Sequence, residues 1–425
     1  MKKLLLFFAC FLMFSGATFG NDTSDAIKND HYNAGCNHHP YSVPEFKDTK
    51  APKGYKPFYV SHYGRHGSRY LTGSEPYAGV NEKLAKLHDA GLLTAEGEAL
   101  REEFIKMGEA HEGQEGILTQ VGSREHQGIG ARLYKRCKRV FNQKDRDQIL
   151  VVSSPITRCV QSAFNFTGSL KAGNPDLQFT LYSGDRFMKY IANWSDNKEL
   201  DRIVWETGDS LIHVFMKDAN PGSKIFTDTA KVKEVLGEKD IARLVYNFIN
   251  KGSIAKCLDI DVDPLSHFSD EELYAHYAAY SARNCGWFRD CAEGHGFRDT
   301  IVGYPLLKDF ITKADEALAG GNKCADLRFG HDSGLGPLLC TIGVEGYDKC
   351  DVPLGKAYLE WPAYKYIPMG SNLQMIFYKN RKGDILVKLL RNEEETTIPA
   401  VSTFEGPYYK WDDLRSYLAK RCKLD

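Results

Sequence analysis

Two short polar clusters and one isolated arginine carry the residue types in this 425-residue chain that are best suited to chemistry. The first cluster is the run R-H-G-S-R over residues 65–69, and the second is the pair His331-Asp332. Arg158 stands between them in the sequence. Together these positions supply three arginines, two histidines and one carboxylic acid.

This set of side chains suits a dianionic phosphoryl group. A guanidinium group presents a planar fork of donors that matches phosphate oxygens, and it keeps its charge. Three such groups, those of Arg65, Arg69 and Arg158, would neutralise the oxygens and stabilise charge while a phosphoryl group is transferred. No metal ion is required for this chemistry, so we expect neither a metal nor another cofactor.

The remaining three side chains suggest the individual catalytic roles. His66 is the candidate nucleophile, because a neutral imidazole nitrogen can attack phosphorus in line. The neighbouring guanidinium groups disfavour a charged imidazole, so we expect a lowered pKa for His66. Asp332 is the candidate general acid for the leaving alkoxide, and His331 would donate a hydrogen bond to a phosphoryl oxygen. The alternative for Asp332 is a helix cap, a role that Asp favours.

Each polar group comes directly after a β-rich run that ends at a turn. The runs cover residues 58–61, 149–152 and 325–329, and each precedes a segment that can begin a helix. Strand, turn and helix joined by long crossovers are typical of an α/β domain with a mostly parallel sheet flanked by helices. Ligands bind beyond the carboxyl ends of strands in such sheets. We therefore expect the six side chains to meet in one crevice.

Hydrophobic periodicity divides the rest of the chain into a core and a cap. Apolar residues recur every three to four positions in three segments, residues 199–216, 241–249 and 271–281. We expect an inserted α-helical cap subdomain over residues 181–299, and an α/β core formed by residues 21–180 and 300–425. Residues 373–378 and 385–390 predict an antiparallel hairpin near the end of the core.

The two polar clusters also resemble a known family. The run over residues 65–69 resembles the R-H-G-x-R signature of the histidine acid phosphatases, and the pair at 331–332 resembles their downstream H-D pair. The resemblance implies a phosphoglycerate-mutase-like core and hydrolysis of phosphomonoesters through a phosphohistidine. It assigns the nucleophile to His66, the proton donor to Asp332, and the phosphate ligands to Arg65, Arg69, Arg158 and His331.

Other stretches indicate which group of enzymes within this family the chain resembles. Residues 118–136 resemble the family's L-T-x-x-G helix, and residues 151–163 and 371–374 resemble the multiple inositol polyphosphate phosphatases. That likeness implies inositol polyphosphates such as phytate as the substrate class. Many of those enzymes carry H-A-E where residues 331–333 read H-D-S, so the proton donor here is placed as in phytases.

Several alternatives remain open at this point. The chain could be a broad-specificity acid phosphatase for sugar phosphates or bisphosphoglycerate, a phosphomutase of the phosphoglycerate type, or a non-catalytic exported protein that binds phosphorylated ligands. Arg186 and Lys189 could bind the outer phosphates of a polyphosphorylated ring. They could equally belong to a solvated helix face.

The overall charge and the first residues indicate which partners the protein can have and where it is located. Lys and Arg number 55 against 56 Asp and Glu, a balance that argues against a nucleic-acid partner. Two lysines, an apolar run and small residues predict a cleavable signal peptide over residues 1–20. The apolar run is too short to span a bilayer comfortably, so we do not expect an integral membrane protein. We expect an exported monomer, periplasmic, secreted or vesicle-associated, whose partner is a small phosphorylated molecule.

The cysteines fit an exported chain. Ten remain beyond the predicted signal peptide, and an even number in such a chain favours disulfide bonds. Their spacing lacks the paired C-x-x-C pattern of a zinc site. They are Cys36, Cys137, Cys159, Cys257, Cys285, Cys291, Cys324, Cys340, Cys350 and Cys422.

Overall fold

The computed structural model describes the chain from residue 19 onward, with short gaps. The gaps are residues 46, 74, 193–197, 218, 290, 293–295, 298–299, 349–352 and 425. Residues 1–18, which make up most of the predicted signal peptide, lie outside the described residues. None of the helices in the described part combines the length and apolarity needed to cross a bilayer.

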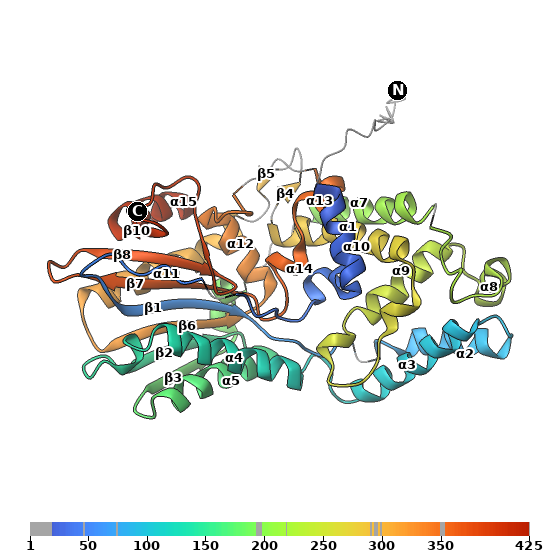
Figure 1. Ribbon diagram of the computed structural model, residues 1–425, viewed down its shortest axis with the longest axis horizontal. Helices are drawn as coiled ribbons and strands as arrows, with labels where there is room; N and C mark the ends of the chain where they lie inside the picture. The colour runs from blue at the N-terminus through green and yellow to red at the C-terminus, as the bar shows by residue number, and fades with distance from the viewer. Residues whose placement is uncertain are drawn as a thin grey trace, which may run out of the picture.

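One mixed sheet forms the centre of the core lobe (Figure 1), with the strand order β10-β8-β7-β1-β6-β2-β3 and β9 paired to β8. The strands are β1 (Lys56–Arg65), β2 (Gln148–Ser153), β3 (Gln178–Ser183), β6 (Lys323–Gly330), β7 (Asn372–Lys379), β8 (Ile385–Arg391), β9 (Glu394–Thr396) and β10 (Tyr408–Lys410). The three strands and the hairpin expected from the sequence are present, and the α/β class is confirmed. The sheet is only half parallel, because the β7–β8 hairpin pairs antiparallel with β1.

Helices cover both faces of this sheet (Figure 1). One face packs against α4 (Gln120–Arg136) and α5 (Thr157–Gly173), and the other against α11 (Thr300–Ala319), α12 (Asp332–Ile342) and α15 (Trp411–Cys422). Alternation along β1 explains the two cores, since Val60 joins the core under α4 and α5 whereas Tyr59 joins the opposite one. Phe166 of α5 is fully buried on one face of the sheet, and Leu338 of α12 is fully buried on the other.

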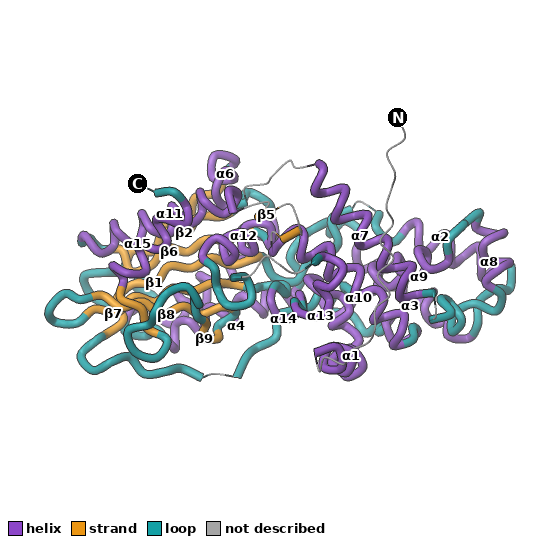
Figure 2. The backbone as a smooth tube through the Cα atoms, turned by 90° about the horizontal axis from the view of Figure 1, so that it is seen from above, coloured by secondary structure: helices purple, strands orange, loops and turns teal. Residues whose placement is uncertain are grey.

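A helical lobe lies at one end of the sheet, as Figure 2 shows. It contains α1 (Phe19–Asn29), η1 (His31–His38), α2 (Ala78–Asp89), α3 (Ala95–His111), α7 (Lys198–Met216), α8 (Thr229–Leu236), α9 (Ile241–Gly252), α10 (Asp270–Asn284), α13 (Ala357–Glu360) and α14 (Ala363–Tyr366). The three expected cap helices correspond to α7, α9 and α10, so their positions are confirmed.

The lobe is not the single insertion over residues 181–299 that the sequence suggested. Strand β3 runs to Ser183 and belongs to the sheet, whereas α2 and α3, counted with the core, pack among the cap helices. The Thr94 amide donates to the Ile225 carbonyl at 3.1 Å, which joins the segment that carries α2 and α3 to the later cap segment. Local periodicity cannot reveal this, because it identifies helices without saying which lobe they pack against.

Six cysteines are buried free thiols, and the predicted disulfides are wrong for them: Cys36, Cys137, Cys159, Cys257, Cys324 and Cys422. Their sulfurs lie in separate parts of the interior; Cys36 Sγ is 3.4 Å from Ser281 Oγ, and Cys257 Sγ donates to the His38 carbonyl at 3.0 Å. A buried cysteine packs as a small apolar residue, so an even count does not require pairing. Cys350 and the side chain of Cys291 lie outside the described residues.

Candidate active site

The loop after β1 is held from both sides by the neighbouring strands. The His66 amide donates to the Gly330 carbonyl at the end of β6 (2.9 Å), and the His66 carbonyl accepts from the Gly370 amide before β7 (2.9 Å). The carboxyl ends of β1 and β6 therefore meet at this point, as expected for adjacent parallel strands.

Helix α4 supports the same loop. Glu125 accepts from both the amide and the hydroxyl of Ser68, each at 2.7 Å. Thr119 caps the helix by accepting from the Gly122 amide at 3.2 Å. A Cβ at Gly122 would overlap the Ser68 carbonyl oxygen, so the close approach of helix and loop requires glycine there.

His66 is buried, and its hydrogen bonding determines which nitrogen can react. Its Nδ1 lies 2.9 Å from the Gly67 carbonyl oxygen, which can only accept, so Nδ1 carries the proton and Nε2 keeps its lone pair. Burial, followed by the charges of Arg65, Arg158 and Arg69, holds the pKa of His66 well below its ordinary value. Both effects favour the neutral imidazole, which is the direction that the sequence predicted.

Arg65 is fully buried and held on three sides. Its Nη1 donates to the carbonyls of Asn37 and Ile367, each at 2.8 Å, and its Nη2 lies 2.8 Å from Asp332 Oδ2. These contacts orient the guanidinium plane and leave the residue little freedom to move.

The other two arginines retain unused donors. Arg69 donates from Nη1 to the Tyr70 carbonyl at 2.9 Å, and Arg158 Nη2 lies 3.5 Å from His331 Nδ1. The buried Nε of each has no hydrogen-bond partner among the described residues. Burial and then the charges of Arg158 and Arg65 lower the pKa of Arg69 to about 10, and burial lowers the pKa of Arg158. Crowded positive charge with spare donors is a suitable environment for an anion.

His331 and Asp332 stand at the amino end of α12. The His331 ring lies edge-on to the His66 ring, with 5.5 Å between centroids, and its Nε2 is 3.1 Å from Ser154 Oγ. Burial and then the charge of Arg158 lower the pKa of His331 to about 4. His331 itself occupies the N-cap position, so the side chain of Asp332 is not the cap and its Oδ2 turns instead to Arg65.

Asp332 is ionised in the free protein. Burial alone would raise the pKa of its carboxyl group, but the charges of Arg65, His331 and Arg69 lower it overall. The amide of Asn37 contributes as well, by donating from Nδ2 to Asp332 Oδ2 at 3.0 Å. Sequence reasoning missed Asn37, because it lies in the short, kinked helix η1 before the first strand and belongs to no recognisable motif.

The two basic residues suggested for outer phosphates make other contacts. The Arg186 guanidinium stacks 4.6 Å from the centroid of the Phe187 ring and lines a cavity of about 410 Å³ with Asp309 and Arg328. Lys189 is exposed on the adjacent short helix α6 (Met188–Ile191). The structure brings together the six side chains of the clusters, and these two residues are not among them.

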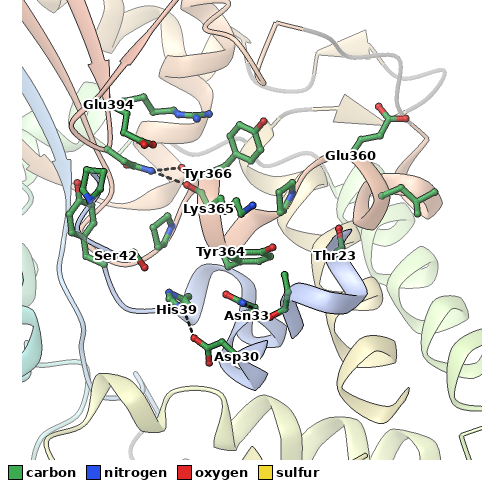
Figure 3. Close-up of a pocket in the computed structure, with 18 residues that line it drawn as sticks. Thr23, Asp30, Asn33, His39, Ser42, Glu360, Tyr364, Lys365, Tyr366 and Glu394 are labelled. Atoms are coloured by element: carbon green, nitrogen blue, oxygen red, sulfur yellow. Dashed lines mark hydrogen bonds and ion pairs between the residues drawn. The ribbon is translucent and has the colours of Figure 1, made fainter. Parts of the chain in front are cut away.

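A second cavity, of about 930 Å³, opens between the N-terminal helices and the segment around α14 (Figure 3). Asp30, His39, Tyr364 and Lys365 point into it, and none of the six clustered side chains lines it. It is therefore a separate feature of the molecule and not part of the arginine-rich site.

Comparison with known proteins agrees with this geometry. The histidine phosphatase superfamily (branch 2) matches residues 64–392, whereas no curated protein sequence matches the chain. The multiple inositol polyphosphate phosphatase of Bifidobacterium longum, in complex with inositol hexasulfate, superposes with a TM-score of 0.72 at 21% identity over 91% of this chain and 97% of that one.

Two phytases share the fold at greater distance. The phytase from D. castellii has a TM-score of 0.69 at 17% identity, with 92% of this chain and 85% of that chain covered. The phytase from Citrobacter braakii has a TM-score of 0.53 at 12% identity, with 86% and 99% covered. At these identities the structural likeness establishes the fold alone. The family match spans more than half of the chain and includes all six clustered side chains, so the chain belongs to the histidine phosphatase superfamily, branch 2.

Proposed function

We propose that this protein hydrolyses phosphomonoesters through a phosphohistidine formed on His66. The observation that carries the proposal is a neutral, buried imidazole with a free Nε2 beside three arginines and an acid. The arginines would bind the phosphoryl oxygens, and His331 would add a further contact.

The reaction would take place in two steps. In the first, Nε2 of His66 attacks phosphorus, the bond from phosphorus to the ester oxygen breaks, and protonated Asp332 gives its proton to the leaving alcohol. In the second, the Asp332 carboxylate takes a proton from water, which attacks phosphorus and displaces His66 as inorganic phosphate forms. The Gly67 carbonyl supports the positive charge on the phosphorylated ring by accepting from Nδ1.

Proton donation requires that substrate change the state of Asp332. Its carboxyl group is ionised in the free protein because of the surrounding positive charge. A phosphate dianion would offset the charges of the three arginines and so raise the pKa of Asp332 when substrate binds. Mildly acidic conditions would then favour the protonated acid.

We further propose inositol polyphosphates such as phytate as the substrate class. The likeness of residues 151–163 and 371–374 supports this, as does the shared fold with an inositol polyphosphate phosphatase bound to inositol hexasulfate and with phytases. The test is phosphate release from phytate, p-nitrophenyl phosphate, sugar phosphates and bisphosphoglycerate. Phytate turned over no better than p-nitrophenyl phosphate would reject the inositol assignment.

The variant His66→Ala tests the mechanism itself. It should retain binding of inorganic phosphate, because the arginines remain, while hydrolysis falls by roughly 10⁴-fold or more. Rapid quenching in alkaline denaturant with labelled substrate should trap a protein-bound phosphate, stable in alkali and labile in acid, in the wild type and not in the variant. A wild-type protein that binds phosphate tightly without releasing it from any ester would support the non-catalytic alternative.

We also propose that the chain is exported as a monomer after removal of residues 1–20, on the basis of the pattern of those residues. The test is the amino-terminal sequence of the protein recovered from cell fractions. A mature protein that still begins at Met1 in the cytoplasmic fraction would reject export.

A further inference from the structure

We propose that Asn37 is a positioning residue for the proton donor, holding the Asp332 carboxyl group in place and tying it to the helical lobe. This inference rests on the proposed function, since it concerns the acid of that same reaction. Asn37 comes from η1, near the amino end of the chain, whereas Asp332 begins α12 in the core lobe.

Three contacts of Asn37 support this role. Its side-chain Nδ2 donates to Asp332 Oδ2 at 3.0 Å, and its carbonyl accepts from Arg65 Nη1 at 2.8 Å. Its amide donates to Asn284 Oδ1 on α10 at 3.2 Å. One buried residue thus contacts the acid, the arginine that is paired with the acid, and a cap helix.

The backbone just before Asn37 is strained. Cys36 has φ 51° and ψ −117°, a region that residues with a side chain rarely occupy. Its side chain is fully buried with Sγ near Ser281 Oγ, and packing against α10 therefore retains the conformation. The backbone kinks at this residue within η1, and the side chain of Asn37, which follows the kink, is turned toward Asp332.

The bonding around the carboxyl group shows what Asn37 contributes. Asp332 Oδ2 is contacted by Asn37 Nδ2 and by Arg65 Nη2. Its Oδ1 accepts from the amide of Ser333 at 2.9 Å. The buried Oδ1 of Asn37 has no hydrogen-bond partner among the described residues. The amide is thus oriented with its donor toward the carboxyl group, the arrangement that stabilises the ionised acid.

Loss of the Asn37 amide should raise the pKa of Asp332. The other groups that act on the carboxyl remain in place, and they are Arg65, Arg69, Arg158, His331, His38, Tyr280, Tyr63 and Cys159. The amide stabilises the ionised form, so its removal favours the protonated form and moves the alkaline fall of activity to higher pH. The carbonyl that holds Arg65 belongs to the backbone and is retained in every variant at this position.

The test compares Asn37→Ala with the wild type on two esters, glycerol 2-phosphate and p-nitrophenyl phosphate. The alkaline midpoint of kcat should rise by about one pH unit, the effect of one hydrogen bond to an ionised group. Turnover of the alkyl ester, which needs a proton on its leaving oxygen, should fall roughly tenfold or more, and that of the nitrophenyl ester less than about threefold.

Asn33→Ala is the matched control. Asn33 lies on the same helical segment, where its Nδ2 donates to the Ala26 carbonyl at 2.8 Å and does not contact Asp332. The control should change neither the midpoint nor the ratio of the two esters. Should Asn37→Ala fail to fold, as judged by its thermal unfolding, Asn37→Asp keeps the shape and places a second carboxyl group beside Asp332, so the midpoint should rise further.

Equal losses on both esters with an unchanged midpoint would overturn the positioning role and indicate only a packing role. Wild-type protein that hydrolyses neither ester, nor any other phosphomonoester, would instead refute the proposed function on which the inference rests. The two failures are distinguishable because only the second affects the wild type.

Discussion

Arg69 offers a test of whether the site is built for an anion at the expense of stability. We expect Arg69→Met to unfold at a higher temperature than the wild type when no ligand is present. Burial and the neighbouring arginines lower the pKa of Arg69 to about 10, which corresponds to about 3 kcal/mol against the charged form in the folded state. The unfolded chain does not experience this repulsion, so folding carries that cost at neutral pH.

The net effect is smaller than this figure. Partial exposure of the Arg69 side chain reduces the cost to about 2 kcal/mol. The hydrogen bond to the Tyr70 carbonyl, which the variant loses, contributes about 1 kcal/mol in the opposite direction. About 1 kcal/mol of stabilisation remains, which should raise Tm by about 2 °C in a chain of this length.

Thermal unfolding with and without inorganic phosphate is the assay. At a concentration about 100 times its Kd, phosphate should stabilise the wild type by about 2.7 kcal/mol, and it should stabilise the variant less because a phosphate ligand is missing. The order of the two Tm values should therefore reverse when phosphate is added. A variant that is less stable than the wild type under both conditions would refute the reasoning.

Arg328→Met is the comparison, because Arg328 is also a core-lobe arginine, more deeply buried than Arg69, but has acidic partners. The charges of Asp309 and Asp326 raise its pKa although burial alone would lower it. Its removal leaves Asp309 without the guanidinium group that it is paired with, and we expect a loss of roughly 3–5 kcal/mol. The two arginines should thus respond in opposite directions to the same substitution.

The site supports three further predictions. The pKa of His66 is lowered well below its ordinary value and that of His331 to about 4, so protonation of these histidines should cause no loss of kcat/KM between neutral pH and about pH 5, and a fall toward acid centred near pH 6.5 would contradict a neutral His66. Asp332→Asn should lower turnover of alkyl phosphates by roughly 10²–10⁴-fold and of p-nitrophenyl phosphate much less, which parallel rate measurements on the two substrates would check. Gly122→Ala should destabilise the protein and reduce activity, because the added methyl group displaces the Ser68 carbonyl; a variant with wild-type Tm and rate would contradict this account of the loop.

Much of the core lobe could be predicted because polar, charged residues mark the ends of its strands. Arg65, Arg158 and His331 stand at or just after β-rich runs, and parallel strands bring such ends to one edge. The hairpin was equally visible, since its two apolar runs flank a polar turn. These features are local in the sequence, and local patterns are what hydrophobic periodicity reports.

The rest depends on contacts between distant segments. The strand β3 escaped prediction because most of its residues are exposed at the sheet edge, so no alternation of buried and exposed residues marks it. The role of Asn37 depends on a strained residue and on Arg65, which is remote in sequence. The membership of α2 and α3 in the helical lobe likewise depends on contacts with residues near 225.

The position of β1 in the sheet has a consequence for how the protein is made. Strand β1 lies near the beginning of the sequence, whereas its two neighbours in the sheet, β6 and β7, come from the last third. A growing polypeptide therefore cannot assemble the loop that carries His66, because the carbonyl and amide that hold His66 belong to Gly330 and Gly370. Folding of this kind, dominated by pairings distant in sequence, is slow, and truncated translation products should be inert as well as prone to aggregation.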